Sequence, residues 1–404
     1  MVNQYFSYYS GTEAMMMLQA KELQKNGHEV YFFGSNRKPY IDSDYQYLHL
    51  LPERKVGTKN YLKNPINYYY DKGIQNALNN IIEEIKPDII HCQYIDTLTY
   101  SIFNCFRDIP TVLTFHSSYV SFCPTGLLSN KNYIDCPNLC KHGNFLACIK
   151  NDCKNNIEAS IRRAIFGYVS YKNFKNVDMY ITPSEALRQK CINADIGIKP
   201  EQIVTINNFI SDEQLQTIPN YTNKKYFLYV GRLVKHKGVK YILEAAKDLP
   251  RDIEFHIVGT GEEEKNLKEY AKQNNLDNVK FLGYKSGADL QEEYQNCIAI
   301  IVPSIWLESF GMINVEAFIN GKPVIGSRIG GIPEVVDNDI NGLLFEPTNV
   351  EQLKQKILMY WNNPELVIKH GKNGYEKTKK KYTPQRYYEQ LMKVYNEVLK
   401  VNEN

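Results

Sequence analysis

The sequence ESFGMINVE at residues 308–316 follows a short apolar run, residues 298–302, and has the character of a helix start. Phe310, Gly311 and Met312 would present free backbone N–H groups at the helix N-terminus, which is a natural site for an anion. Gly311 has no side chain, so the backbone there can approach a ligand closely. The stretch therefore predicts a site for a negatively charged group beyond the end of a strand.

Two carboxylates frame this stretch. Glu308 and Glu316 are eight residues apart, so we expect both on one face of the helix, where they can accept hydrogen bonds from hydroxyl groups. An ordinary amphipathic helix with acidic residues near its start is the alternative.

A basic loop, GRLVKHKG at residues 231–238, also lies between a predicted strand and a predicted helix. Arg232 would offer a charged fork and Lys237 a point charge to a strongly anionic ligand. A solvated basic loop is the alternative. Two turns follow, GGIPE at 330–334 and NGLLF at 341–345, and each also fits ordinary turn chemistry.

Strands and helices alternate along the second half of the chain. The predicted strands are 226–230, 253–258, 279–282 and 298–302, with helical spacing of apolar residues in 239–249 and in 288–296. This alternation predicts a parallel sheet with right-handed crossovers.

The first half repeats this pattern less regularly. A helix is predicted at 13–26, and strands at 28–33, 88–92, 111–115, 178–182 and 203–206. The polar stretch 207–224 is the predicted linker. It separates an N-terminal domain, 1–207, from a C-terminal domain, 208–383, and we expect a last helix in 384–404 to pack back on the N-terminal domain. The fold class is α/β, with two Rossmann-like domains whose parallel sheets face an interdomain cleft, where ligands bind in this architecture.

Composition narrows the classes of protein. At 404 residues the chain suits two domains, and its net charge of only +3 argues against bulk binding of nucleic acid. No apolar run approaches the roughly 18 residues needed to span a bilayer, and we find no secretion signal. We therefore expect a cytoplasmic protein.

In this order and at these intervals, the 308–316 stretch, the 231–238 loop and the 330–334 turn resemble the C-terminal half of the retaining glycosyltransferases of family 4. Those enzymes have the GT-B fold, and the joint match over residues 225–350 is highly specific.

Two segments of the first half extend the resemblance to nearly the whole chain. SGTE at 10–13 resembles the family's glycine loop after the first strand, and TFH at 114–116 resembles its strand-ending catalytic histidine. Ser10 replaces the first of two glycines usual in that loop, which would restrict it.

The resemblance implies roles for the matched residues of the second domain. Arg232 and Lys237 would bind the donor diphosphate and stabilise the leaving group. Glu308 would contact hydroxyls of the transferred sugar, and Glu316 would hold the ribose. The remaining donor contacts would come from the backbone of Ser309, Phe310, Gly311 and Met312.

The resemblance also implies roles in the first domain. Gly11 and Thr12 would belong to a donor-binding loop that closes over the phosphate. His116 would touch the sugar beside the reacting carbon, whereas a lone histidine at a strand end would otherwise be structural.

The implied reaction moves a sugar from a UDP- or GDP-sugar to a glycan or lipid-linked acceptor with retention of configuration, in bacterial surface polysaccharide synthesis. Breaking the anomeric bond builds oxocarbenium character and a diphosphate leaving group, which fixed positive groups can stabilise in place of a metal. We therefore expect no metal and no cofactor. No carboxylate in these motifs is an obvious nucleophile, which favours attack on the same face, with the leaving phosphate taking the acceptor's proton.

Two other functions fit the fold: a nucleotide-sugar epimerase, and a nucleotide-sugar-binding partner without activity. An epimerase would lack the 231–238 loop in this form. The presence of His116 with both glutamates favours an enzyme over an inactive partner.

Two segments raise the question of a metal. Asp42-Ser43-Asp44 fits the Asp-x-Asp motif of the other large glycosyltransferase fold, but such a triplet arises easily and we assign no metal there.

An insertion at about 121–154 is rich in cysteine and also contains His142. Its spacing is not that of a standard zinc site, so a structural metal, free thiols and a disulfide all remain open. The cysteines are Cys123, Cys136, Cys140, Cys148 and Cys153.

Segment 154–176 is basic, and its isoleucines at 157, 161 and 165 and Val169 recur every four residues. This pattern fits an amphipathic helix lying on anionic lipid at the inner face of the cell membrane. A helix that packs this apolar stripe on the sheet is the alternative.

The first strand is short in the sequence. Residues 5–10 look like loop, which leaves only Val2, Asn3 and Gln4 as the tail of a strand that usually needs about five or six residues. We therefore expect the natural start of the protein to lie several codons upstream of Met1.

Overall fold

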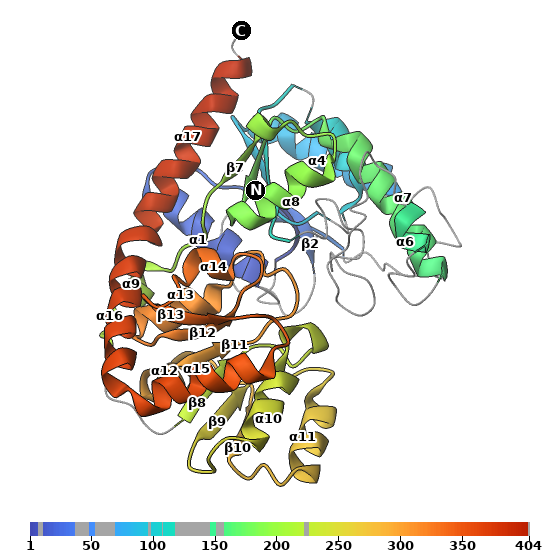
Figure 1. Ribbon diagram of the computed structural model, residues 1–404. Helices are drawn as coiled ribbons and strands as arrows, with labels where there is room; N and C mark the ends of the chain where they lie inside the picture. Colours follow the sequence, from blue (N-terminus) through green and yellow to red (C-terminus); the bar gives the residue numbers. More distant parts are fainter. Residues whose placement is uncertain are drawn as a thin grey trace. The chain divides into compact units, whose positions relative to one another are not determined.

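The computed structural model describes residues 1–6, 11–36, 48–52, 69–95, 98–106, 108–117, 146–150, 157–221 and 226–402. The chain divides into two compact units, Met1–Asn207 with Pro384–Asn404, and Asn208–Thr383 (Figure 1). Ser10, the Asp42–Asp44 triplet, His142 and every cysteine of the 121–154 insertion except Cys148 lie outside the described residues.

The first unit contains a seven-stranded parallel sheet in the order β3-β2-β1-β4-β5-β6-β7. Its strands are β1 (Val2–Tyr5), β2 (Phe32–Asn36), β3 (Leu48–Pro52), β4 (Ile90–Cys92), β5 (Thr111–Thr114), β6 (Met179–Thr182) and β7 (Ile203–Thr205). β1 lies between β2 and β4, and all four of its residues are buried.

Six helices of the described residues belong to the first unit. They are α1 (Gly11–Lys25), α4 (Lys72–Ile85), α6 (Leu146–Lys150), α7 (Ile157–Phe174), α8 (Glu185–Ala194) and α17 (Pro384–Asn402), with short 3₁₀ turns at Tyr100–Cys105 and Pro200–Gln202. α17 comes from the far end of the chain and lies against α1. A hydrogen bond of 2.9 Å between the His28 ring and the Tyr388 hydroxyl ties α17 to the segment after α1.

Several strand limits differ from the sequence prediction by one or more residues, and the differences at β2 and β1 have a local structural cause. β2 begins at Phe32 rather than His28, because the turn that ends α1 continues through His28, whose N–H donates to the Leu23 carbonyl at 3.1 Å. β1 includes Tyr5, which the sequence analysis left in a loop, because Tyr5 still pairs with Ser35 of β2.

The second unit contains a six-stranded parallel sheet in the order β10-β9-β8-β11-β12-β13. Its strands are β8 (Tyr226–Val230), β9 (Glu254–Val258), β10 (Val279–Gly283), β11 (Ile300–Val302), β12 (Val324–Ser327) and β13 (Gly342–Phe345). Its helices are α9 (Asp212–Leu215), α10 (Val239–Lys247), α11 (Glu264–Gln273), α12 (Gly287–Asn296), α13 (Met312–Ile319), α14 (Ile332–Val335), α15 (Val350–Asn362) and α16 (Pro364–Lys381), with a 3₁₀ turn, η5, at Lys235–Lys237. The predicted α/β class with parallel sheets is confirmed.

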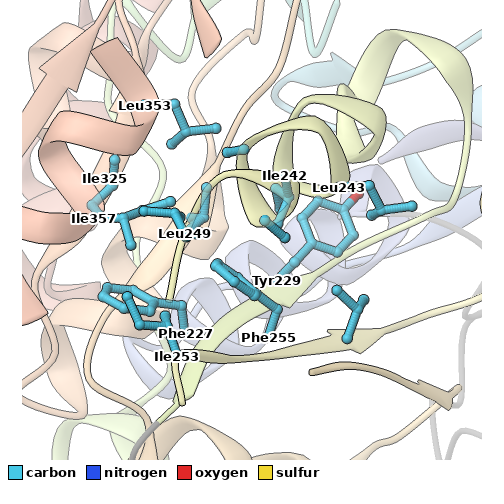
Figure 2. Packing of buried hydrophobic residues seen from close by; sticks show 14 of the residues in the cluster. Phe227, Tyr229, Ile242, Leu243, Leu249, Ile253, Phe255, Ile325, Leu353 and Ile357 are labelled. Carbon is cyan, nitrogen blue, oxygen red and sulfur yellow. The ribbon is translucent and has the colours of Figure 1, made fainter. Parts of the chain in front are cut away.

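Both faces of this sheet are buried, as parallel strands require. On one face, Phe227 and Tyr229 of β8 pack with Ile242 of α10 and Leu353 of α15 (Figure 2). Leu228 points to the other face, where it joins a second apolar cluster with side chains of α13 and α14. The sheet is thus fixed between two helical layers, which holds the loops at the strand ends in place.

Candidate functional site

The loop between β11 and α13 carries the stretch that the sequence analysis singled out. α13 begins at Met312, so Glu308 lies ahead of the helix and Glu316 lies within it. The prediction that both carboxylates share one helix face is therefore wrong. The cause is Gly311, whose φ of +87° is left-handed and interrupts any helix that would run back to Glu308.

The start of α13 leaves backbone N–H groups open. Within the described residues, the N–H groups of Phe310, Gly311 and Met312 donate to no protein acceptor, although the Gly311 carbonyl accepts the N–H of Asn314 at 3.0 Å. The Phe310 side chain is 1% exposed and meets the Tyr382 ring edge-on at 5.6 Å, so only its backbone is accessible to a ligand. These groups can receive an anion at the positive end of the helix.

Glu308 and Lys237 form an ion pair. The Lys237 Nζ lies 2.6 Å from Glu308 Oε1, and the Ser304 hydroxyl donates to the same oxygen at 2.5 Å. Burial by itself raises the pKa of Glu308, but the Lys237 charge and these hydrogen bonds outweigh it and hold that pKa below its ordinary value. Glu308 is therefore ionised at neutral pH although it is only 7% exposed.

The loops that carry this pair are fastened to each other. The N–H of Ile305 donates to the His236 carbonyl at 3.0 Å. Gly238 has a φ of +74°, and a Cβ there would collide with the Pro303 carbonyl. A glycine is thus required at position 238 for the basic loop to approach the loop of Glu308.

The turn at 330–334 supports the same loop. The N–H of Gly331 donates to the Glu308 carbonyl at 2.8 Å. Gly330 has a φ of +58°, and a Cβ there would overlap the backbone of Glu308. This turn therefore holds the backbone that carries the carboxylate.

The structure gives Glu316 a separate partner. Its Oε2 accepts the Tyr294 hydroxyl of α12 at 2.7 Å, and burial raises the pKa of this carboxyl group above its ordinary value. Arg232 lies at the end of β8 with an exposed side chain, and its carbonyl accepts the Tyr229 hydroxyl at 2.9 Å. Of the predicted side chains of this unit, the structure therefore joins Lys237 directly to Glu308.

In the first unit, His116 follows β5 and is half-buried. Its Nε2 lies 2.6 Å from Oε1 of Gln93, and burial lowers the pKa of the His116 ring to about 4. Gly11 and Thr12 begin α1, and no atom of the described residues lies within 4 Å of a Cβ built on Gly11.

Several residues around these side chains had no sequence signal. Ser304 precedes Glu308 by four residues and fits no motif by itself. Gln93 lies 23 residues before His116, and Tyr294 lies 22 residues before Glu316. Only the fold brings each of them to its partner.

Two Rossmann-like units, each built on a sheet of parallel strands, are the architecture of glycosyltransferases with the GT-B fold. The chain belongs to the glycosyltransferases: the family model described as Glycosyltransferase Family 4 matches residues 9–214, and that described as Glycosyl transferases group 1 matches residues 211–377.

Sequence comparison with other proteins supports this family assignment. A glycosyltransferase of Methanocaldococcus jannaschii is 32% identical, over 81% of this chain and 88% of its own length. The capsular polysaccharide biosynthesis glycosyltransferase CapM of Staphylococcus aureus is 26% identical over 55% of this chain and 62% of its own.

Solved structures agree on the fold. Sucrose-phosphate synthase from Thermosynechococcus elongatus aligns with a TM-score of 0.75 and 18% identity, over 99% of this chain and 96% of that one. Anabaena HepE in complex with UDP aligns with a TM-score of 0.71 and 17% identity, over 98% of both chains. In the part of the chain that the structure describes, no helix is both long and apolar enough to cross a membrane.

Proposed function

We propose that this glycosyltransferase moves a sugar from a UDP- or GDP-sugar to a glycan or lipid-linked acceptor with retention of configuration, in the synthesis of a surface polysaccharide. The observation that carries the donor assignment is the Lys237–Glu308 pair beside the open N-terminus of α13. HepE, which shares the fold, has been solved with UDP and with UDP-glucose, and CapM acts in capsular polysaccharide biosynthesis.

Charge and geometry suggest how the donor binds. Lys237 has three N–H donors, so it can keep its bond to Glu308 and still donate to a phosphate oxygen. Arg232 is exposed and free to turn toward the other phosphate, and the N–H groups at the start of α13 add fixed positive partial charge. Glu308, ionised and close to these groups, would accept hydrogen bonds from the sugar hydroxyls.

The remaining matched residues complete the proposed site. Glu316 would hold the ribose, and the Tyr294 hydroxyl would orient its carboxyl group. Gly11 and Thr12, at the start of α1, would receive the phosphate, and His116 would touch the sugar.

The proposed transfer step needs no nucleophile from the protein. The bond between the anomeric carbon and the phosphate oxygen breaks, and its electron pair leaves with the nucleoside diphosphate. The acceptor hydroxyl attacks from the face that the phosphate leaves, and its proton passes to the departing phosphate oxygen. Lys237, Arg232 and the α13 N–H groups stabilise the negative charge that develops on that phosphate, which is the work a metal ion would otherwise do.

Mass spectrometry of products from a panel of UDP- and GDP-sugars tests this proposal. We expect one nucleotide sugar to be consumed with release of its nucleoside diphosphate. Lys237→Ala and Arg232→Ala should each lower the rate by about tenfold to a hundredfold or more, since a charge-assisted hydrogen bond is worth about 1.5–3 kcal/mol. Lys240→Ala is the matched control, because Lys240 is an exposed lysine of the next helix, paired with Glu244. Turnover near that of the wild type in either site variant would refute the donor assignment.

We also propose that α7 contacts anionic lipid at the inner face of the cell membrane. Ile157 is 70% exposed and Ile161 41%, so this end of the apolar stripe is only partly used in packing. Co-sedimentation with vesicles of anionic lipid, compared with vesicles of zwitterionic lipid, tests this contact. Replacing Ile157 and Ile161 by serine should abolish it, and undiminished binding would refute it.

A further inference from the structure

A buried chain of side-chain hydrogen bonds leads from His116 to the C-terminal helix. Oε1 of Gln93 lies 2.6 Å from His116 Nε2, and Nε2 of Gln93 donates to Oε1 of Gln19 at 2.8 Å. Nε2 of Gln19 lies 2.8 Å from His91 Nδ1 and 3.4 Å from the Tyr395 hydroxyl. The chain thus joins β4, β5, α1 and α17.

Every inner member of this chain is shielded from water. Gln93 is 1% exposed, Gln19 and His91 are 2% exposed, and Tyr395 is 8% exposed. A buried amide that loses its partner cannot find water in exchange, so the amides are held in the orientation that satisfies most of their groups.

The direction of the chain follows from Gln19. In the observed orientation its amide nitrogen lies within hydrogen-bond distance of His91 Nδ1 and of the Tyr395 hydroxyl, and that hydroxyl itself lies 2.7 Å from His91 Nδ1. If the oxygen and nitrogen of the Gln19 and Gln93 amides exchanged places, Gln93 Oε1 would be the one partner of the Gln19 nitrogen in the described part of the chain. The observed direction therefore gives the Gln19 nitrogen two acceptors within reach, whereas the reversed direction gives it one.

This direction decides which nitrogen of each histidine carries the proton. Since Gln93 donates through its nitrogen to Gln19, the atom that it turns to His116 is an oxygen, which can only accept. His116 Nε2 must then carry a hydrogen. His91 accepts at Nδ1, so its proton also lies on Nε2, from which it donates to the Thr114 hydroxyl at 2.8 Å.

We propose that Gln93 is a positioning residue that holds neutral His116 in the tautomer with its proton on Nε2, and that Gln19 fixes the direction of the Gln93 amide. Nδ1 of His116 is then an acceptor and has no partner among the described residues. Burial lowers the pKa of His116 to about 4 and that of His91 well below its ordinary value, so both rings are neutral near pH 7. If the proposed function holds, Nδ1 of His116 accepts a hydrogen bond from a hydroxyl of the donor sugar.

Nitrogen NMR of the full-length protein labelled with ¹⁵N-histidine tests the tautomer without any need for activity. In wild-type protein, the His116 and His91 signals should both show a protonated Nε2 and an unprotonated Nδ1. Replacement of each histidine in turn assigns the signals. A protonated Nδ1 at His116 in the wild type would overturn the proposal, whatever the variants do.

Two variants test the transmission through the amides. Gln93→Leu removes the acceptor of His116, and Gln19→Leu removes the group that orients Gln93 without any contact to His116. Both should convert the His116 signal to a mixture of tautomers. Thr111→Val is the matched control, because it removes a partly buried hydrogen bond to the Ile109 carbonyl from β5, the strand that precedes His116, and leaves the chain of hydrogen bonds intact. An unchanged His116 tautomer in Gln93→Leu, or a change of equal size in Thr111→Val, would refute the proposal.

Kinetics separate this inference from the proposed function. Gln93→Leu should lower kcat/KM for the sugar donor by about two- to tenfold, the value of one hydrogen bond. Inhibition by the nucleoside diphosphate alone should be unchanged, because the inference connects His116 to the sugar. Weaker inhibition by the diphosphate in Gln93→Leu would indicate general damage and count against a positioning role. Wild-type protein with the expected tautomer but no turnover of any nucleotide sugar would refute the proposed function alone.

Discussion

Replacing Lys237 by methionine removes the charge opposite Glu308 and keeps a side chain of similar length. The two side chains are 23% and 9% exposed, so the pair is partly buried. Loss of one partner of a fully buried pair costs about 3–5 kcal/mol, and the exposure of Lys237 reduces this to about 1–3 kcal/mol of unfolding free energy here. Ser304 remains as a hydrogen-bond donor to Glu308, which also limits the loss.

The pH dependence of this loss has a definite sign. In the wild type the pKa of Glu308 is lower in the folded protein than its ordinary value of 4.5, so its stabilisation is present above that value and is lost as the pH falls through the folded pKa. Burial is already the largest single influence on this pKa, and without the charge and hydrogen bond of Lys237 it is no longer outweighed, so the pKa of Glu308 in the folded protein rises. The ionised carboxylate then destabilises the variant at neutral pH, and protonation relieves this as the pH falls toward 4.5.

Urea unfolding of wild-type protein and Lys237→Met at about pH 7.5 and about pH 5 measures both effects. We expect the unfolding free energies of the wild type and of Lys237→Met to differ less at about pH 5 than at about pH 7.5. Lys240→Met is the control, since its exposed pair with Glu244 should contribute less than about 1 kcal/mol and show no such narrowing. A difference that stays constant or widens on acidification would refute the assignment of an ionised, Lys237-stabilised Glu308.

Three further predictions follow from the same unit. Glu316→Gln should raise KM for every nucleotide sugar, because the ribose is common to all of them. Glu308→Gln should instead lower kcat and alter the preference among sugars. Identical kinetic changes in the two variants would show that these roles are wrongly assigned. Full activity is expected in excess EDTA, and activity that disappears and returns with added manganese or magnesium would contradict the metal-independent mechanism. Gly330→Ala should destabilise the protein by about 1–3 kcal/mol and weaken donor binding, because it combines a φ of +58° with a collision against Glu308. Gly287 has a similar φ of +54°, and no atom of the described residues lies within 4 Å of a Cβ built there, so an equal loss of donor binding in Gly287→Ala would show that the collision is irrelevant.

The parallel sheet of the second unit was predictable because its signals are local. β8 and α10 were predicted within two residues of their ends, from an apolar run that stops at Gly231 and from apolar residues at helical spacing after Gly238. In the first unit, the start of β2 was predicted four residues early, because the turn that ends α1 extends to His28, whose backbone N–H donates to the Leu23 carbonyl.

The candidate site was only partly predictable. Lys237 and Glu308 were identified separately, but their spacing of 71 residues contains no information that they pair. The spacing of Glu308 and Glu316 suggested a shared helix face, and this failed because Gly311 adopts a left-handed conformation before the helix begins. A glycine permits that conformation without requiring it, so the sequence alone could not reveal it.

The sequence by itself determined the class of fold, because apolar runs and helical periodicity dictate which segments become strands and helices, and their alternation dictates a parallel sheet. It also specified which side chains carry charge near the strand ends. The tertiary structure alone decided the partners: Glu308 with Lys237, and the chain from His116 through Gln93 to Tyr395, whose members are up to 376 residues apart. Such contacts depend on how whole elements pack, and a hydrogen bond between distant residues leaves no periodic trace in the chain.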